Sequence, residues 1–117
     1  MSDGSENIYL LNPKDFSQID QLQVYHQTDK INLLNELEVI GNDLYANVYT
    51  TKSDEIIIID LLTGRVKGII DLKGLIDRSK YPGIDHVLNG IASDQNKLFV
   101  TAKWHPYLYE IDLIKVQ

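Results

Sequence analysis

The residue pattern of Leu33-Leu-Asn-Glu-Leu-Glu-Val-Ile-Gly-Asn-Asp-Leu-Tyr-Ala-Asn-Val-Tyr49 occurs twice in the chain and is the main indication of its fold. In the second copy Asn89 takes the place of Asn35, and the pair Leu98-Phe99 takes the place of Leu44-Tyr45. Both pairs of positions are 54 residues apart. A repeat of this length is typical of architectures that place copies of one small sheet side by side.

The stretch itself has the pattern of a β-hairpin. Gly41-Asn-Asp43 is a turn sequence that tolerates positive φ, and it separates residues 34–40 from a returning strand at 44–50. Polar and apolar residues alternate in the first strand. One face is expected to carry Leu34, Glu36, Glu38 and Ile40, and the other Asn35, Leu37 and Val39.

Further strands are expected on both sides of this hairpin. Residues 56–60 are echoed by residues 108–112, and the isoleucines at 56–59 suit a strand buried on both faces. One short helix or irregular turn is expected at 73–80. The remaining strands, for a total of about nine, are expected at 8–12, 21–26, 65–71, 87–92, 97–102 and 107–113.

Short strands, frequent turn signals and the long repeat together predict an all-β fold of four-stranded sheets, as in a β-propeller. We expect residues 1–117 to form a single unit that holds a little over two blades. Propellers close with at least about four blades. The chain is therefore expected to be a partial propeller with unpaired strand edges.

Composition limits the classes of function. The 117 residues are 44% hydrophobic, which is enough for one globular core. A net charge of -6 with scattered lysines and arginines argues against a nucleic-acid partner, and the lack of cysteine excludes disulfides and thiolate metal sites. The sequence shows neither a signal peptide nor a membrane span, which indicates the cytoplasm or a piece of something larger.

The histidines and paired carboxylates do not have the pattern of a metal site. His26, His86 and His105 are far apart, and none has a ligand at a helpful spacing. Glu36 and Glu38 look like an acid–base pair, but on a strand they share one face, which favours a solvated stripe. We therefore expect no catalytic metal and no cofactor.

Six motifs, taken in order and at their distances, resemble the plant and bacterial type of glutaminyl-peptide cyclotransferase, a family of five-bladed propeller enzymes. Any one of them alone is weak, and the specificity lies in their agreement. The resemblance spans essentially the whole chain but only about the C-terminal half of the family's fold. The motifs are Ser2-Asp-Gly-Ser5, Leu34-Asn-Glu-Leu-Glu38, Ala46-Asn-Val-Tyr49, Ile59-Asp-Leu-Leu-Thr-Gly64, Leu88-Asn-Gly-Ile-Ala92 and Thr101-Ala-Lys-Trp-His-Pro106.

The resemblance implies an activity and a set of site residues. The family converts N-terminal glutamine into pyroglutamate with release of ammonia, so glutamine-initiated peptides or proteins are the expected partners. By resemblance, the catalytic candidate Asn35 would hold the substrate amide or amine, and the second, Lys103, would stabilise developing negative charge. Tyr49 would form part of an aromatic wall, and Trp104 and Glu36 complete the substrate-binding candidates.

Departures from the family pattern accompany the matches. Tyr49 replaces the usual tryptophan, Ala102 replaces the usual glycine, and Trp104 is shifted by one place, which on a strand would turn its ring to the other side. The family's general acid–base glutamate lies in earlier blades, which this chain lacks. The chain is therefore expected to hold only part of a site and to be weakly active or inactive alone.

Simpler roles stay open for these residues. Asn35 and Asn89 occupy equivalent positions in the repeat, where a turn-capping amide is common, and a lone Lys103 is ordinarily a solvated lysine. The alternative function is a non-catalytic propeller module that binds a peptide or protein. Three explanations of the incompleteness compete: a gene fragment or internal start, part of a longer protein, or a half-propeller that closes with a partner such as a second copy.

Overall fold

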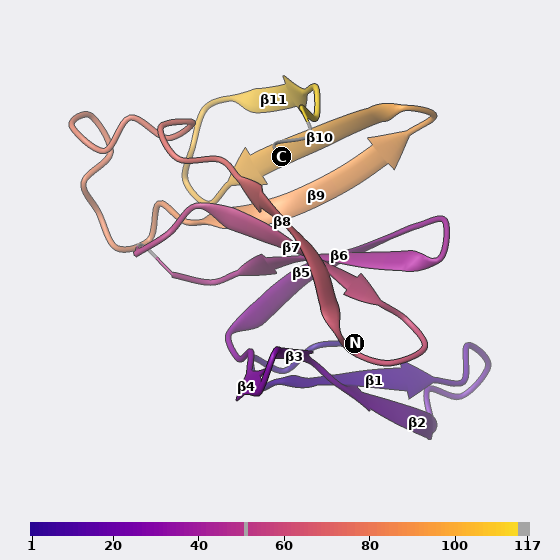
Figure 1. Cartoon of the computed structure of the whole chain (residues 1–117). Helices are drawn as coiled ribbons and strands as arrows, with labels where there is room; N and C mark the ends of the chain where they lie inside the picture. Colours follow the sequence, from indigo (N-terminus) through magenta and orange to yellow (C-terminus); the bar gives the residue numbers. More distant parts are fainter. Residues whose placement is uncertain (51, 115–117) are drawn as a thin grey trace.

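The computed structural model describes residues 1–50 and 52–114, and all regular structure in this part of the chain is β-strand (Figure 1). None of the described residues form a helix of the length and apolarity that crossing a membrane requires. The strands are β1 Asn7–Leu11, β2 Gln18–Gln23, β3 Tyr25–His26, β4 Asp29–Lys30, β5 Leu34–Ile40, β6 Asp43–Val48, β7 Glu55–Asp60, β8 Val66–Asp71, β9 Leu88–Asp94, β10 Lys97–Ala102 and β11 Leu108–Ile111.

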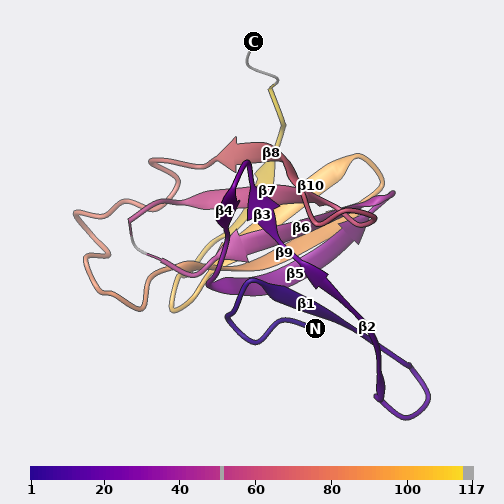
Figure 2. The same ribbon diagram turned by 60° about the horizontal axis from the view of Figure 1, so that its bottom comes forward.

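A four-stranded sheet forms the middle of three layers. Its strands follow chain order, β5-β6-β7-β8, and each neighbouring pair is antiparallel. The sheet β9–β11 lies on one side of it, and the β1–β2 hairpin lies on the other (Figure 1). The short strands β3 and β4 lie in front of the middle sheet in Figure 2, where Tyr25 forms a parallel bridge with Arg65.

The middle sheet is apolar on both faces. In β7, Ile56 faces a core shared with β9–β11, whereas Ile57 and Ile59 face a second core shared with the hairpin, and none of the three is more than 4% exposed. The prediction that the isoleucine run is a strand buried on both faces is therefore confirmed. Burial on both sides fixes the sheet between its two neighbours.

The predicted fold class is confirmed: the chain is all-β and forms a partial propeller. The segment at 73–80, for which a short helix or an irregular turn is expected, forms turns and no helix. The expected strand at 21–26 divides between β2 and β3, because Val24 leaves the hairpin to enter the core at 0% exposure. The described residues form eleven strands rather than nine, since β3 and β4 have two residues each.

The sequence repeat is reproduced in the hydrogen bonds. In the first copy the Tyr49 N–H donates to the Leu33 carbonyl over 2.8 Å, and in the second the Lys103 N–H donates to the Val87 carbonyl over 2.8 Å. Both donors and both acceptors are 54 residues apart. Equivalent strands of the two copies therefore begin and end at equivalent residues.

The first strand of the repeat departs from the alternation predicted for it. Its register with β6 shifts between Leu34 and Leu37, which places a β-bulge at Asn35 and Glu36. Leu34 and Leu37 consequently pack in the core beside the hairpin, whereas Ile40 packs against the core beside β9–β11. The prediction that Leu34 and Ile40 share a face is wrong, because the irregularity reverses the alternation.

Replacing Gly64 with alanine should destabilise the chain strongly. Gly64 has φ of 77°, and an added Cβ would lie 2.0 Å from the Gln23 carbonyl oxygen, so backbone strain and a backbone clash act together. We expect Gly64→Ala to lower the free energy of unfolding by about 2–4 kcal/mol, measured by urea unfolding.

Gly41→Ala is the matched control for this substitution. Gly41 also has positive φ, at 62°, but an added Cβ would meet nothing within 4 Å. Its cost should be confined to backbone strain, about 1–2 kcal/mol. Equal losses in the two variants would show that the contact between Gly64 and Gln23 does not matter for stability.

Candidate functional site

The candidate residues lie at one end of two neighbouring sheets, which we call the site end. β5 and β9 begin there, and β6 and β10 finish there. Figure 1 shows these strand ends on the left, beside the long connection from β8 to β9. Asn35 and Glu36 lie at the start of β5, Tyr49 follows β6, and Lys103 and Trp104 follow β10. The topology thus brings together residues that are far apart in the sequence.

The backbone around Asn35 is held by the N-terminal segment. The Ser2 hydroxyl donates to the Asn35 carbonyl over 2.6 Å, and the Leu33 N–H donates to the Gly4 carbonyl over 2.8 Å. Leu33 has φ of 61°, so the chain enters β5 through an unusual conformation. The motif Ser2-Asp-Gly-Ser5, which the sequence alone explains only as a turn, therefore supports the bulge that carries Asn35.

The turn at residues 2–5 is itself ordered by a carboxylate. Asp3 accepts hydrogen bonds from the Ser5 hydroxyl at 2.5 Å and the Ser5 N–H at 2.9 Å, and its second oxygen accepts from the Tyr9 hydroxyl at 3.1 Å. The bonds from Ser5 favour the charged form and lower the pKa of the Asp3 carboxyl below its usual value. Asp3 is thus a structural acceptor within this turn.

Lys103 and Tyr49 occupy equivalent places in the two sheets, directly after the strands that end at the site. The Lys103 side chain is 39% exposed, and its Nζ lies 3.7 Å from a carboxylate oxygen of Asp85, which is 61% exposed. An ion pair this exposed contributes only about 0–1 kcal/mol, so it leaves Nζ accessible to another acceptor. The lysine is neither buried nor fully solvated.

Trp104 lies in a turn and not on a strand. The turn is closed by the His105 N–H, which donates to the Ala102 carbonyl over 3.2 Å. Trp104 has φ of 57° and is 75% exposed, an uncommon conformation and environment for a bulky aromatic residue. The expectation that its ring turns to the opposite face of a strand does not apply, because no strand continues there.

Glu38 connects the two sheets and is not part of a solvated stripe. Its carboxylate accepts hydrogen bonds from the Ser93 N–H at 2.9 Å and the Ser93 hydroxyl at 2.7 Å. These bonds join β5 to β9 near the last residues of both strands, away from the site end. The solvated-stripe interpretation of Glu36 and Glu38 is therefore wrong for Glu38, because the neighbouring sheet supplies donors that spacing along one strand cannot reveal.

Arg78 attaches the connection at residues 72–87 to the middle sheet. Its guanidinium donates to the Asp54 carboxylate and to the His86 carbonyl. The Asp54 side chain is 10% exposed, so its charge is largely removed from water and depends on this partner. Sequence reasoning missed this contact, because nothing along the chain pairs residues so far apart.

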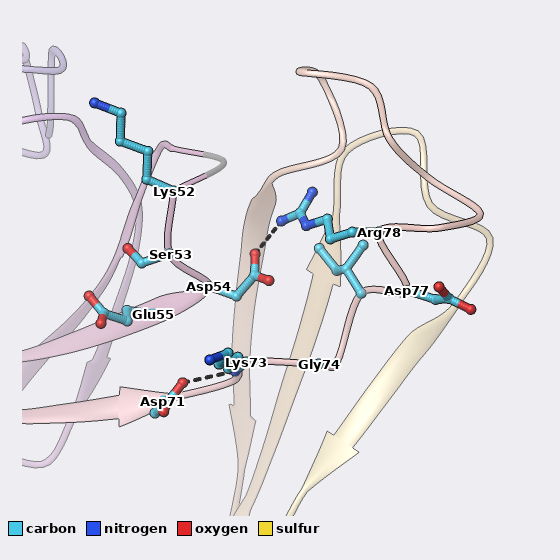
Figure 3. A pocket seen from close by; sticks show the side chains of 10 residues that line it. Lys52, Ser53, Asp54, Glu55, Asp71, Lys73, Gly74, Asp77 and Arg78 are labelled. Carbon is cyan, nitrogen blue, oxygen red and sulfur yellow. Dashed lines mark hydrogen bonds and ion pairs between the residues drawn. The ribbon is translucent and has the colours of Figure 1, made fainter.

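A cavity of about 790 Å³ opens beside the Arg78–Asp54 pair (Figure 3). It lies by the start of β7 and the end of β8, and none of the five candidates lines it. In the described residues no three histidine or acidic side chains gather to hold a metal ion. The cavity is lined by Lys52, Ser53, Asp54, Glu55, Asp71, Lys73, Gly74, Ile76, Asp77 and Arg78.

Comparisons with known proteins agree with one another. Residues 1–113 match the family model described as Glutamine cyclotransferase. The chain is 42% identical over 118 residues to the glutaminyl-peptide cyclotransferase of Arabidopsis thaliana, an alignment that covers 96% of this chain and 36% of that protein. It is also similar to the crystal structure of Myxococcus xanthus glutaminyl cyclase, with a TM-score of 0.88 and 32% identity over 99% of this chain and 51% of that one.

Replacing Arg78 should loosen the connection next to Lys103. Lysine cannot donate to a carboxylate and a carbonyl with one planar group, so Arg78→Lys should lower the free energy of unfolding by about 1–2 kcal/mol in urea titrations. Lys80→Ala is the control, because its pair with Asp77 is long at 3.6 Å and exposed. Its effect should stay below about 0.5 kcal/mol, and a similar loss in both variants would contradict the role of Arg78.

Proposed function

Because the chain belongs to the glutamine cyclotransferase family, we propose that it forms part of an enzyme that converts N-terminal glutamine into pyroglutamate. Its substrates are peptides or proteins that begin with glutamine. In the reaction the α-amine nitrogen attacks the side-chain carboxamide carbon and closes the ring. The original carbon–nitrogen bond then breaks, one proton passes from the amine to the departing nitrogen, and ammonia leaves.

Asn35 and Lys103 take the polar roles in this proposal. The Asn35 amide offers both a donor and an acceptor, which suits the substrate amine or carboxamide. The Lys103 ammonium stabilises the oxyanion that forms when the carboxamide carbon becomes tetrahedral. The observation that carries the proposal is their common position at the site end, where β5 starts and β10 finishes.

Three neighbours complete the proposed site. Tyr49 follows β6 and contributes an aromatic wall, while the exposed ring of Trp104 offers a second apolar surface to the substrate. Glu36 shares the β5 bulge with Asn35, where a carboxylate favours the positively charged amine of an incoming peptide. These assignments rest on sequence resemblance and shared location.

The chain spans about a third to a half of the length of the relatives it matches, 36% of one and 51% of the other. We propose that residues 1–117 correspond to the C-terminal part of such a propeller. In the whole fold, the acid–base carboxylate that moves protons between the two nitrogens comes from the other blades. The isolated chain would then bind the substrate but convert it slowly or not at all.

Ammonia release and binding of a glutamine-initiated peptide test the proposal. Lys103→Ala should reduce any turnover by about 100-fold or more, as expected for loss of an oxyanion-stabilising group. Asn35→Ala should weaken peptide binding about tenfold, the effect of about one hydrogen bond. Calorimetry with the same peptide measures binding whether or not the chain is active.

Matched controls come from the repeat and from the other end of the sheets. Asn89→Ala changes the repeat equivalent of Asn35, and Lys97→Ala removes a lysine at the opposite end of β10. Neither should affect binding by more than about twofold. If the folded parent chain neither releases ammonia nor binds the peptide, the activity proposal fails for this chain, and a non-catalytic module with another ligand is favoured.

A further inference from the structure

Five aromatic and imidazole rings lie together beside Lys103 and Trp104, and we call them the ring cluster. Its hub is His105, which meets Tyr81 edge-on at a centroid distance of 4.6 Å and Tyr107 at 5.3 Å. The His105 ring stacks on Tyr109 at 5.5 Å, and its Nε2 lies 2.5 Å from the Tyr109 hydroxyl. Tyr81 also contacts His86 at 5.3 Å.

The ring cluster joins two separate segments at the site end. Tyr81 and His86 belong to the connection at 72–87, whereas His105 follows the turn that holds Lys103 and Trp104. The same connection supplies the carbonyl of Val87, to which the Lys103 N–H donates over 2.8 Å. The bond from Lys103 to Val87 and the contact of His105 with Tyr81 therefore both join the Lys103 turn to the connection.

The surroundings of His105 suit a neutral imidazole. Its Nδ1 is buried and has no hydrogen-bond partner among the described residues. Arg78 and His86 are the basic groups near it, Tyr81, Tyr107 and Tyr109 are the titratable rings around it, and no carboxylate in the described part of the chain bonds to it. A proton on this ring would add positive charge where no compensating group stands.

We infer that His105 is a positioning residue that holds the Lys103–Trp104 turn in place only while its imidazole is neutral. The inference rests on the proposed function in one respect, that Lys103 acts on the substrate. Protonation of His105 disfavours the packing of its partly buried ring between the tyrosines, and the turn separates from the connection. The orientation of the Lys103 side chain therefore depends on pH.

The direction of the pH dependence follows from the site. Burial of the ring, together with the charges of His86 and Arg78, lowers the pKa of His105 below its ordinary value near 6.5. When the turn opens, the pKa returns toward that value, so the open form binds more protons. The closed turn is therefore fully stabilised above about pH 6.5 and is weakened as the pH falls from there toward the lower pKa of the closed form.

Amide hydrogen exchange at Lys103 tests this inference without a substrate. After correction for the intrinsic effect of pH, protection of the Lys103 N–H should fall by about three- to tenfold between about pH 7.5 and pH 5.5. The Tyr49 N–H is an internal control, since it makes the repeat-equivalent bond of 2.8 Å to Leu33. Its protection should not change in that range.

Two variants separate the charge of His105 from its packing. His105→Phe keeps a ring in the cluster but cannot be protonated, so Lys103 protection should become independent of pH. His26→Asn, at an exposed position in β3, should leave the pH response of Lys103 as in the parent chain. Parallel behaviour of Lys103 and Tyr49 in the parent chain, or an unchanged pH response in His105→Phe, would overturn the inference.

The pH dependence of peptide affinity distinguishes this inference from the proposed function. If the glutamine-initiated peptide binds, its affinity for the parent chain should fall over the same pH range, and the affinity for His105→Phe should not. If no peptide binds but Lys103 protection follows the predicted course, the proposed function fails and the positioning role of His105 stands. If the peptide binds with an affinity that changes equally in both proteins, the positioning role fails and the proposed function stands.

Discussion

A sheet that is apolar on both faces must be covered on both sides, and the rest of this structure depends on that constraint. Ile56 on one face and Ile57 and Ile59 on the other leave the middle sheet stable only between two neighbouring layers. The hairpin and the sheet β9–β11 supply those layers. Packing of β5 beside β9, reinforced by the bonds from Ser93 to Glu38, then aligns the two copies of the repeat.

Alignment of the repeats produces the site end. Because the strands of the two copies begin and end at equivalent residues, the positions at which the copies differ lie together at the strand termini. Tyr49 in one copy and Lys103 in the other show how this works: the backbone bond is the same, whereas the side chains are an aromatic ring and a cation. Repetition provides the framework, and the two copies carry different side chains at equivalent positions. The contacts of Ser2, Arg78 and His105 fix the segments that carry these residues.

Much of this arrangement follows from local sequence. The turn sequence at residues 41–43, the isoleucine run of β7 and the echo between Asn35 and Asn89 predict the strands, the all-β class and the incomplete propeller. The bulge at Asn35 cannot be predicted in this way, because it depends on hydrogen bonds to the N-terminal segment. The same holds for Glu38, Arg78 and His105, whose partners lie on other strands or loops. Patterns along one strand indicate which face a residue occupies only while the register is regular.

We propose that a glutamine-initiated peptide binds at the site end, where residues from both repeats meet. Chemical-shift mapping of such a peptide onto the backbone amides tests this most directly, because the two ends of the sheets are read in one experiment. We expect the largest shifts at Asn35, Tyr49, Lys103 and Trp104, and almost none at the opposite turns near Gly41 and Gln95. Shifts centred on those opposite turns, or spread evenly over the chain, would contradict it.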